Sequence, residues 1–477
     1  MKILLFTITI FFLFTGCVPK VNKLDKIEDL KIQNELLKDL NQFHSKDIQL
    51  ESNWWEKFND PQLNNLIKNA ITNSPTIKQL EQKFKIATNL MKSTKSRNLP
   101  SVDFDSNISR KRYSENYIFP APLGGSYQNL YNTGLNINYD FDFWDERASL
   151  IKATENEALA QKALIKVKQL AISTSITKLY ISWNFKIEKI RKLNSIKKLV
   201  YEKHLILGKL NKLGLENKKR QNESNYKIEK INQNILRMKK EIENIKESIA
   251  VIAGLFPSQI QRLNKPKISN KYQFYLPKDI HLDVISHLPK IAVQKYLLAS
   301  KDAYIKNAKA KFYPNISIKS LIGFTSFPWS NLFKSTSFGP EAGVAVSLPL
   351  FDGNRRKINL NSKLNDYNSQ VYAYNQSIIE AINKIVKTLK LMQLNKSDIS
   401  SQKTVLLNKI KNKNIEKKIF KLGLKNKLSY IDSKIDIQKE DINSIILNDK
   451  KIQLQIELIK SLGGGYKNKV NTNVASN

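Results

Sequence analysis

Cysteine is almost absent from this chain, since Cys17 is the only one among 477 residues. A single cysteine excludes an internal disulfide and any metal site built from several thiolates. The four histidines are scattered, and none has a metal-ligating partner four residues further on. The chain also lacks a phosphate-binding glycine-rich loop and a nucleophile elbow. These absences predict a protein that is not an enzyme and that uses no metal or cofactor.

Long apolar runs are equally scarce. Residues 3–14 form an apolar run of about 12 residues, whereas a membrane-spanning helix needs about 20. Lys2 precedes the run and Gly16 follows it, so residues 1–16 are predicted to be a signal peptide. The stretch from Leu13 to Cys17 resembles the bacterial lipobox, which implies lipidation of Cys17 and sorting to the outer membrane. If the remaining chain crosses a membrane, it must do so with strands in a closed barrel.

Arginine is rare compared with lysine, although the formal net charge is +37. So basic a chain raises nucleic acid or an anionic membrane surface as partners. Nucleic-acid-binding proteins favour arginine, however, because its guanidinium group can form two hydrogen bonds to one phosphate or base. The lysines here are spread along helical stretches. The charge is therefore interpreted as a lysine-rich solvated surface, and no nucleic-acid partner is expected.

The positions of the prolines indicate that the chain contains the same arrangement of helices and strands twice. Pro75 and Pro100 bracket one helical segment, and Pro289 and Pro314 bracket a second segment of equal length, displaced by 214 residues. Proline suits the first turn of a helix and blocks its continuation at the far end. Each segment precedes two runs of alternating apolar residues, which predict strands with two unlike faces. The apolar positions are Val102 and Phe104; Leu135, Ile137, Tyr139, Phe141 and Phe143; Ile316 and Ile318; and Val344, Val346, Leu348 and Leu350.

Two very long helices follow the predicted strands. Residues 146–207 and 354–422 contain no glycine or proline, which predicts helices roughly 90 to 100 Å long if they are continuous. Each ends near a Leu-Gly-Leu turn, and a return helix follows as far as Gly254 or Gly463. The two turns consist of Leu213, Gly214 and Leu215, and of Leu422, Gly423 and Leu424.

The plan predicts an α+β membrane protein with an internal two-fold repeat. Four strands per chain cannot close a barrel, because bacterial barrels start at about eight strands. Three chains would supply twelve, and their paired hairpins would form a helical cylinder. The predicted segments are a linker over 17–60, a first repeat over 61–265, a second over 266–465 and a disordered tail over 466–477.

Three motifs resemble the TolC-like outer-membrane efflux factors, in particular the lipoprotein branch found in multidrug pumps of the resistance-nodulation-division type. Residues 54–63 match the W-W-x-x-F-x-D-P-x-L opening of that branch, and residues 140–145 and 348–353 resemble its two strand-to-helix junctions. The resemblance implies a homotrimer with a twelve-stranded β-barrel in the outer membrane and a periplasmic α-helical barrel. It also implies a passive conduit for small molecules that works with a periplasmic adaptor protein and an inner-membrane pump.

The same resemblance suggests where the channel closes. In that family an acidic residue nine positions after the turn glycine lines a periplasmic constriction, which implies Asp432 here and Glu223 in the first copy. Some members have a second acid three residues earlier, where this chain has Ser429. Phe420 and Lys425 are further gate candidates, and the two Leu-Gly-Leu turns are the candidate surface for adaptor docking.

Three alternative functions remain at this stage. The same fold could pass whole proteins as the outer-membrane component of type I secretion, although the lipobox and Trp54-Trp55 favour the small-molecule branch. A periplasmic coiled-coil adaptor or structural lipoprotein would not need the alternating strands. A basic nucleic-acid-binding coiled coil conflicts with the signal peptide.

Overall fold

The computed structural model describes residues 52–268 and 288–466, which form two compact units. Lys83–Gln161 and Gln294–Tyr374 make up the first, here called the strand unit. The other described residues make up the hairpin unit. Each unit takes segments from both predicted halves of the chain, so neither unit coincides with one half. The signal peptide, Cys17 and the predicted tail from 467 onward lie outside the described residues.

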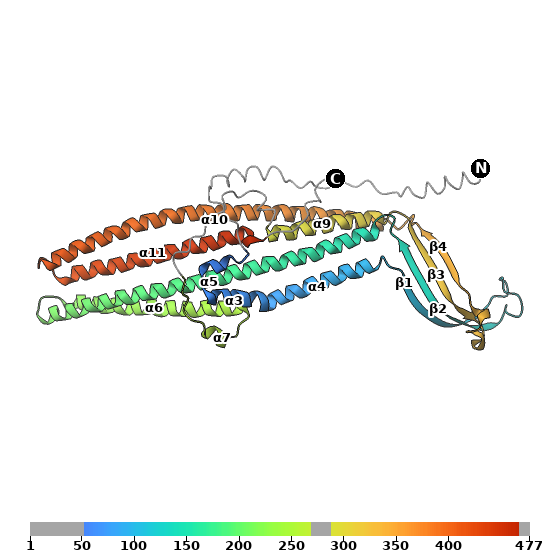
Figure 1. Ribbon diagram of the computed structural model, residues 1–477, viewed down its shortest axis with the longest axis horizontal. Coiled ribbons are helices and arrows are strands. Elements are labelled where there is room, and N and C mark those ends of the chain that lie inside the picture. The colour runs from blue at the N-terminus through green and yellow to red at the C-terminus, as the bar shows by residue number, and fades with distance from the viewer. Residues whose placement is uncertain (1–51, 269–287, 467–477) are drawn as a thin grey trace. The chain divides into compact units, whose positions relative to one another are not determined.

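The strand unit contains one antiparallel sheet in the order β1-β2-β3-β4. The central pair β2–β3 joins the two halves of the chain, with Phe141 opposite Ile316 and Tyr131 opposite Ser326. The strands are β1 (Ser101–Arg112), β2 (Tyr127–Phe141), β3 (Asn315–Ser326) and β4 (Glu341–Ser347), shown together in Figure 1. The apolar side chains of β1 and β4 stay exposed, for example Phe104 at 69% and Val344 at 70%. These two strands therefore present apolar surface that the described part of the chain does not cover.

Three predicted strand residues lie outside the strands. β2 ends at Phe141, so Phe143 follows it, and β4 ends at Ser347, before Leu348 and Leu350. Proline lacks the N–H that a ladder needs, and Pro349 stands between these two leucines. β4 has seven residues, fewer than the nine to eleven expected for a membrane-crossing strand.

Both strand-to-helix junctions use an aspartate and an arginine. Asp142 accepts hydrogen bonds from the backbone N–H groups of Arg147 (3.0 Å) and Ala148 (2.7 Å), at the start of α5. Asp352 accepts from the backbone N–H of Arg356 (3.2 Å) and from its Nε (2.8 Å), at the start of α10. Each arginine also donates to the carbonyl seven residues before it, which belongs to Asp140 in the first junction and Pro349 in the second.

The helices of the two halves correspond closely in length. α4 (Pro75–Ser96) and α9 (Pro289–Ala310) have 22 residues each. α5 (Glu146–Lys212) and α10 (Arg355–Lys421) have 67 each, and the return helices α6 (Lys218–Ala253) and α11 (Lys427–Ser461) have 36 and 35. The expected end of the first long helix near Leu213 is confirmed, since α5 continues through Gly208 to Lys212. Among the described helices, none is both long and apolar enough to span a bilayer.

In the hairpin unit the helices lie side by side in the order α6-α5-α11-α10 (Figure 1). Ion pairs mark each neighbour: Lys186 with Glu241 joins α5 to α6, Lys192 with Asp441 joins α5 to α11, and Lys409 with Asp436 joins α10 to α11. α5 and α11 therefore occupy central positions, and α6 and α10 flank them.

The main core surrounds the W-W-x-x-F-x-D-P-x-L opening. Trp54, Trp55 and Phe58 are buried in a short 3-10 helix, next to α3 (Pro61–Asn73). Asp60 caps α3 and accepts a hydrogen bond of 3.0 Å from the hydroxyl of Tyr180 on α5. Burial and the charge of Asp60 raise the pKa of Tyr180. The motif thus has a packing role, because it ties α3 to the long helix.

Candidate functional site

The two hairpin turns have nearly identical backbone geometry. Gly214 and Gly423 both have φ of 73°, a left-handed conformation that glycine adopts without strain. The residue after each glycine donates a hydrogen bond across the turn, from Leu215 to the carbonyl of Leu210 (2.9 Å) and from Leu424 to that of Ile419 (3.1 Å). This is the Schellman pattern of a helix C-terminus, and it confirms that the glycines end the long helices.

Four leucines are exposed at these turns. Leu213 and Leu215 are 69% and 71% exposed, and Leu422 and Leu424 are both 72% exposed. Large apolar side chains gain free energy when another surface covers them. The turns therefore offer two small apolar surfaces, at the positions that the sequence indicated for docking.

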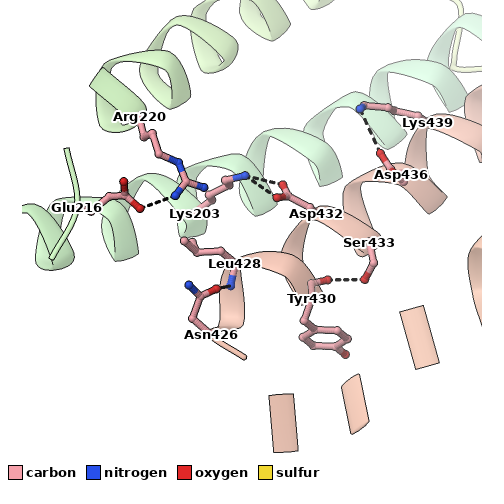
Figure 2. A network of polar contacts seen from close by, with 10 residues as sticks. All are labelled: Lys203, Glu216, Arg220, Asn426, Leu428, Tyr430, Asp432, Ser433, Asp436 and Lys439. Carbon is pink, nitrogen blue, oxygen red and sulfur yellow. Dashed lines mark hydrogen bonds and ion pairs between the residues drawn. The ribbon is translucent and has the colours of Figure 1, made fainter. Parts of the chain in front are cut away.

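Asp432 is paired with a lysine of the other hairpin. Lys203 Nζ on α5 lies 2.6 and 2.7 Å from the two carboxylate oxygens of Asp432 on α11 (Figure 2). Lys203 is 16% exposed, whereas Asp432 is 51% exposed. The carboxylate thus keeps one open side, while its charge is balanced within the chain. Sequence analysis had not indicated Lys203, because its role depends on α5 lying beside α11.

Two more ion pairs join α5 to α11 toward the turns. Lys427 lies 2.6 Å from Glu202, and Lys192 lies 2.7 Å from Asp441. With the Lys203–Asp432 pair, they connect the two hairpins at three levels. Any movement that separates α5 from α11 in this region must break these pairs.

Glu223 lies on the same groove as Asp432. This groove is about 780 Å³ in volume and lies between α5, α6 and α11. Its floor is apolar, with Val200 and Ile435 among its residues, and Lys227 stands on its α6 side. The two acids that occupy corresponding places in the two copies are therefore brought to one surface of one chain.

The remaining gate candidates lie on the second hairpin. The ring of Phe420 stacks on Tyr430, with 6.2 Å between centroids and 7° between planes. Lys425 lies 3.5 Å from Glu416, so it holds the turn to α10. Ser429, one helical turn before Asp432, is half-buried and adds no charge. These residues stabilise the second turn locally, and a double acidic position is absent from this chain at 429 and 432.

A second charged group lies deeper in the hairpin unit. Glu457 on α11 binds Lys178 of α5 and Lys384 of α10, the latter at 2.6 Å. Burial opposes ionisation of Glu457, but the hydrogen bonds from both lysines outweigh it and lower its pKa to about 2. Its carboxylate therefore links three helices. Within the described residues, no group of three potential metal ligands comes together.

A four-stranded antiparallel sheet and two long helical hairpins with exposed leucines at their turns are the elements of a channel subunit of the outer-membrane efflux type. The profile of the outer membrane efflux protein family matches residues 66–246 and 283–464. The chain belongs to this family, so it is an outer-membrane efflux channel protein and not an enzyme. The resemblance inferred from the three motifs is thereby confirmed.

Individual relatives agree with this assignment. The multidrug resistance outer membrane protein MdtP of Escherichia coli K12 is 26% identical over 434 residues, covering 87% of each chain. The solved structure of VceC from Vibrio cholerae has a TM-score of 0.79 at 22% identity, covering 88% of this chain and all of that one. CmeC of Campylobacter jejuni, an outer membrane channel, gives a TM-score of 0.80 at 18% identity, with 96% of each chain covered. These structures share the fold.

Proposed function

We propose that three copies of this chain form a passive channel that exports small molecules across the outer membrane as part of a tripartite pump. The observation that carries this proposal is the four-stranded sheet, whose edge strands β1 and β4 are unpaired within the described chain. An unpaired edge and an uncovered apolar face both need a partner. Three sheets joined edge to edge give a twelve-stranded barrel, which satisfies every edge.

An internal repeat accounts for the paired features of the chain. The long helices have equal lengths, and Arg147 and Arg356 make the same contact at the two junctions. Both turn glycines have the same φ. A duplicated unit over 61–265 and 266–465 explains these correspondences. Lipidation of Cys17 would add an anchor to the outer membrane, and replacing Cys17 by serine should abolish incorporation of labelled palmitate.

The hairpin turns are the proposed docking surface for a periplasmic adaptor, and an inner-membrane pump would supply the energy. The exposed leucines at both turns support this role. The names of the relatives, which are multidrug resistance outer membrane proteins, support small-molecule cargo. Asp432 is the proposed gate residue: three copies around the trimer axis would place three carboxylates at the periplasmic entrance, where they would favour cations.

Planar-bilayer recordings test this function. Purified protein should run as a trimer and should give discrete conductance steps. Asp432→Asn should lower the preference for cations and, by releasing Lys203, raise the frequency of opening. Asp398→Asn is a matched control, since Asp398 is an exposed acid on α10 away from the turns. A protein that gives neither trimers nor conductance steps would refute the channel, and equal records for the two variants would remove Asp432 from the gate.

A further inference from the structure

Positive charge is concentrated at the hairpin ends. The hairpin ends, defined as residues 193–232 and 403–442, contain 21 lysines and arginines but nine aspartates and glutamates. The strand segments 101–141 and 315–347 contain five of each. The hairpin ends therefore carry a net charge of +12 over 80 residues, which is a denser positive charge than the +37 spread over all 477 residues, whereas the strand segments are neutral.

Six of the nine acids at the hairpin ends form ion pairs within the chain. Glu216 pairs with Arg220, Glu416 with Lys425 at 3.5 Å, and Glu202 with Lys427 at 2.6 Å. Six exposed lysines around the turns form no ion pair within the described residues: Lys209, Lys212, Lys218, Lys219, Lys418 and Lys421. They surround the four exposed leucines, so each turn combines an apolar centre with a cationic rim.

Some of these cations occupy the unfavourable end of a helix. Lys218 and Lys219 form the first turn of α6 together with the ion-paired Arg220, and α6 has no acid in its first turn. The N-terminus of a helix carries partial positive charge, so lysine there lowers helix stability. Residues that oppose local stability are expected at functional sites. An anionic surface from outside the chain would reverse this penalty.

We infer that the docking partner presents an acidic surface, with apolar side chains at its centre and carboxylates around them. The apolar side chains would cover the leucines of each turn, and the carboxylates would face Lys212, Lys218, Lys219 and Lys421. This inference rests on the proposed function, because it specifies the chemistry of the adaptor that the turns bind. In the trimer, six cationic turns would repel one another, and an acidic partner removes that repulsion.

Synthetic helical-hairpin peptides test the inference on the purified full-length trimer. One peptide has two leucines at its turn flanked by four glutamates, a second has glutamines in place of the glutamates, and a third has lysines. The glutamate peptide should bind about tenfold more tightly than the glutamine peptide at low salt, and the preference should shrink as salt screens the charges. The lysine peptide should bind most weakly.

Two matched variants separate local recognition from net charge. The first replaces Lys212, Lys218, Lys219 and Lys421 by glutamine and should lose the preference for glutamate. The second replaces the exposed α4 lysines by glutamine, which changes the net charge by the same amount; they are Lys83, Lys85, Lys92 and Lys95. This variant should keep the preference for the glutamate peptide. The inference fails if glutamate and glutamine peptides bind wild-type protein alike, or if both variants lose the preference equally. Conductance steps from the same preparation show separately that the channel itself is intact.

Discussion

The two helical hairpins have the same dimensions, yet different side chains hold their return helices. α6 buries isoleucines at a seven-residue spacing, including Ile228, Ile235, Ile242 and Ile249. α11 buries isoleucines mainly at its two ends, and its acids Asp432, Asp436, Asp441 and Glu457 pair with lysines. The positions of the two helices differ: α6 contacts α5 and the short helix α3, whereas α11 lies between the two long helices α5 and α10. A helix with two helical neighbours needs contacts on two faces, and here charged side chains provide many of them.

The largest change in the free energy of unfolding is expected from a buried isoleucine of α6. Ile249 is fully buried in the main core, and Ile249→Ala should lower the free energy of unfolding by about 2–5 kcal/mol because it leaves a cavity. Val251→Ala on the same helix is the control, since Val251 is 82% exposed. Urea unfolding followed by circular dichroism measures both. Equal midpoints for the two variants would show that α6 is not held by its isoleucines.

The polar contact of α11 should give a smaller, pH-dependent effect. Because the folded pKa of Glu457 is lowered from 4.5 to about 2, its stabilisation is present above pH 4.5 and is lost as pH falls toward 2. Glu457→Gln should cost about 1–2 kcal/mol at neutral pH, after allowance for solvent screening of exposed Lys384, and nothing near pH 2. Unfolding across this pH range, with Glu247→Gln as an exposed control, measures the difference. A cost that does not change with pH would contradict it.

In contrast to Glu457, the ionised carboxylate of Asp449 is expected to lower the stability of the folded chain. Burial raises the pKa of Asp449, so its ionised form is disfavoured in the folded chain, despite the hydrogen bond from Gln453. Asp449→Asn should therefore stabilise the protein at neutral pH, and the gain should disappear as pH falls below 3.8. Thermal unfolding at several pH values measures it. A loss of stability at pH 7 would mean that the attraction of Lys186 and Lys189 outweighs burial.

The smallest changes in the free energy of unfolding are expected at the turns, where the two hairpins have the same backbone geometry. Lys218→Gln removes a cation from the N-terminus of α6 and should raise the free energy of unfolding by a few tenths of a kcal/mol. Lys212→Gln removes one from the C-terminus of α5 and should lower it by a similar amount. Changes of the same sign would indicate that net charge, and not helix polarity, governs stability at the turn.

Much of the local structure could be predicted from residue patterns. Pro75 and Pro289 mark helix starts, and Gly214 and Gly423 mark helix ends, because proline and glycine restrict or permit backbone angles irrespective of distant contacts. Alternation placed all four strands, but it missed the ends of β2 and β4. β2 ends directly before Asp142, which caps α5, and Pro349 prevents β4 from continuing; periodicity detects neither feature.

The candidate site was predictable in part. The turn leucines followed from the pattern, and Asp432 followed from the family resemblance. Lys203 could not be assigned, since 229 residues separate it from Asp432 and nothing in the local pattern pairs them. The same limit applies to Lys178 and Lys384, whose connection through Glu457 spans three helices.

The sequence by itself determined where helices begin, turn and end, and it determined which strand faces are apolar, because these properties arise from interactions within a few residues. The tertiary structure decided that α11 lies between α5 and α10, and therefore which lysine meets which carboxylate. Such pairing depends on contacts between residues far apart in the chain. It decides whether an acid at the turn, such as Asp432, is a free charge or half of an ion pair.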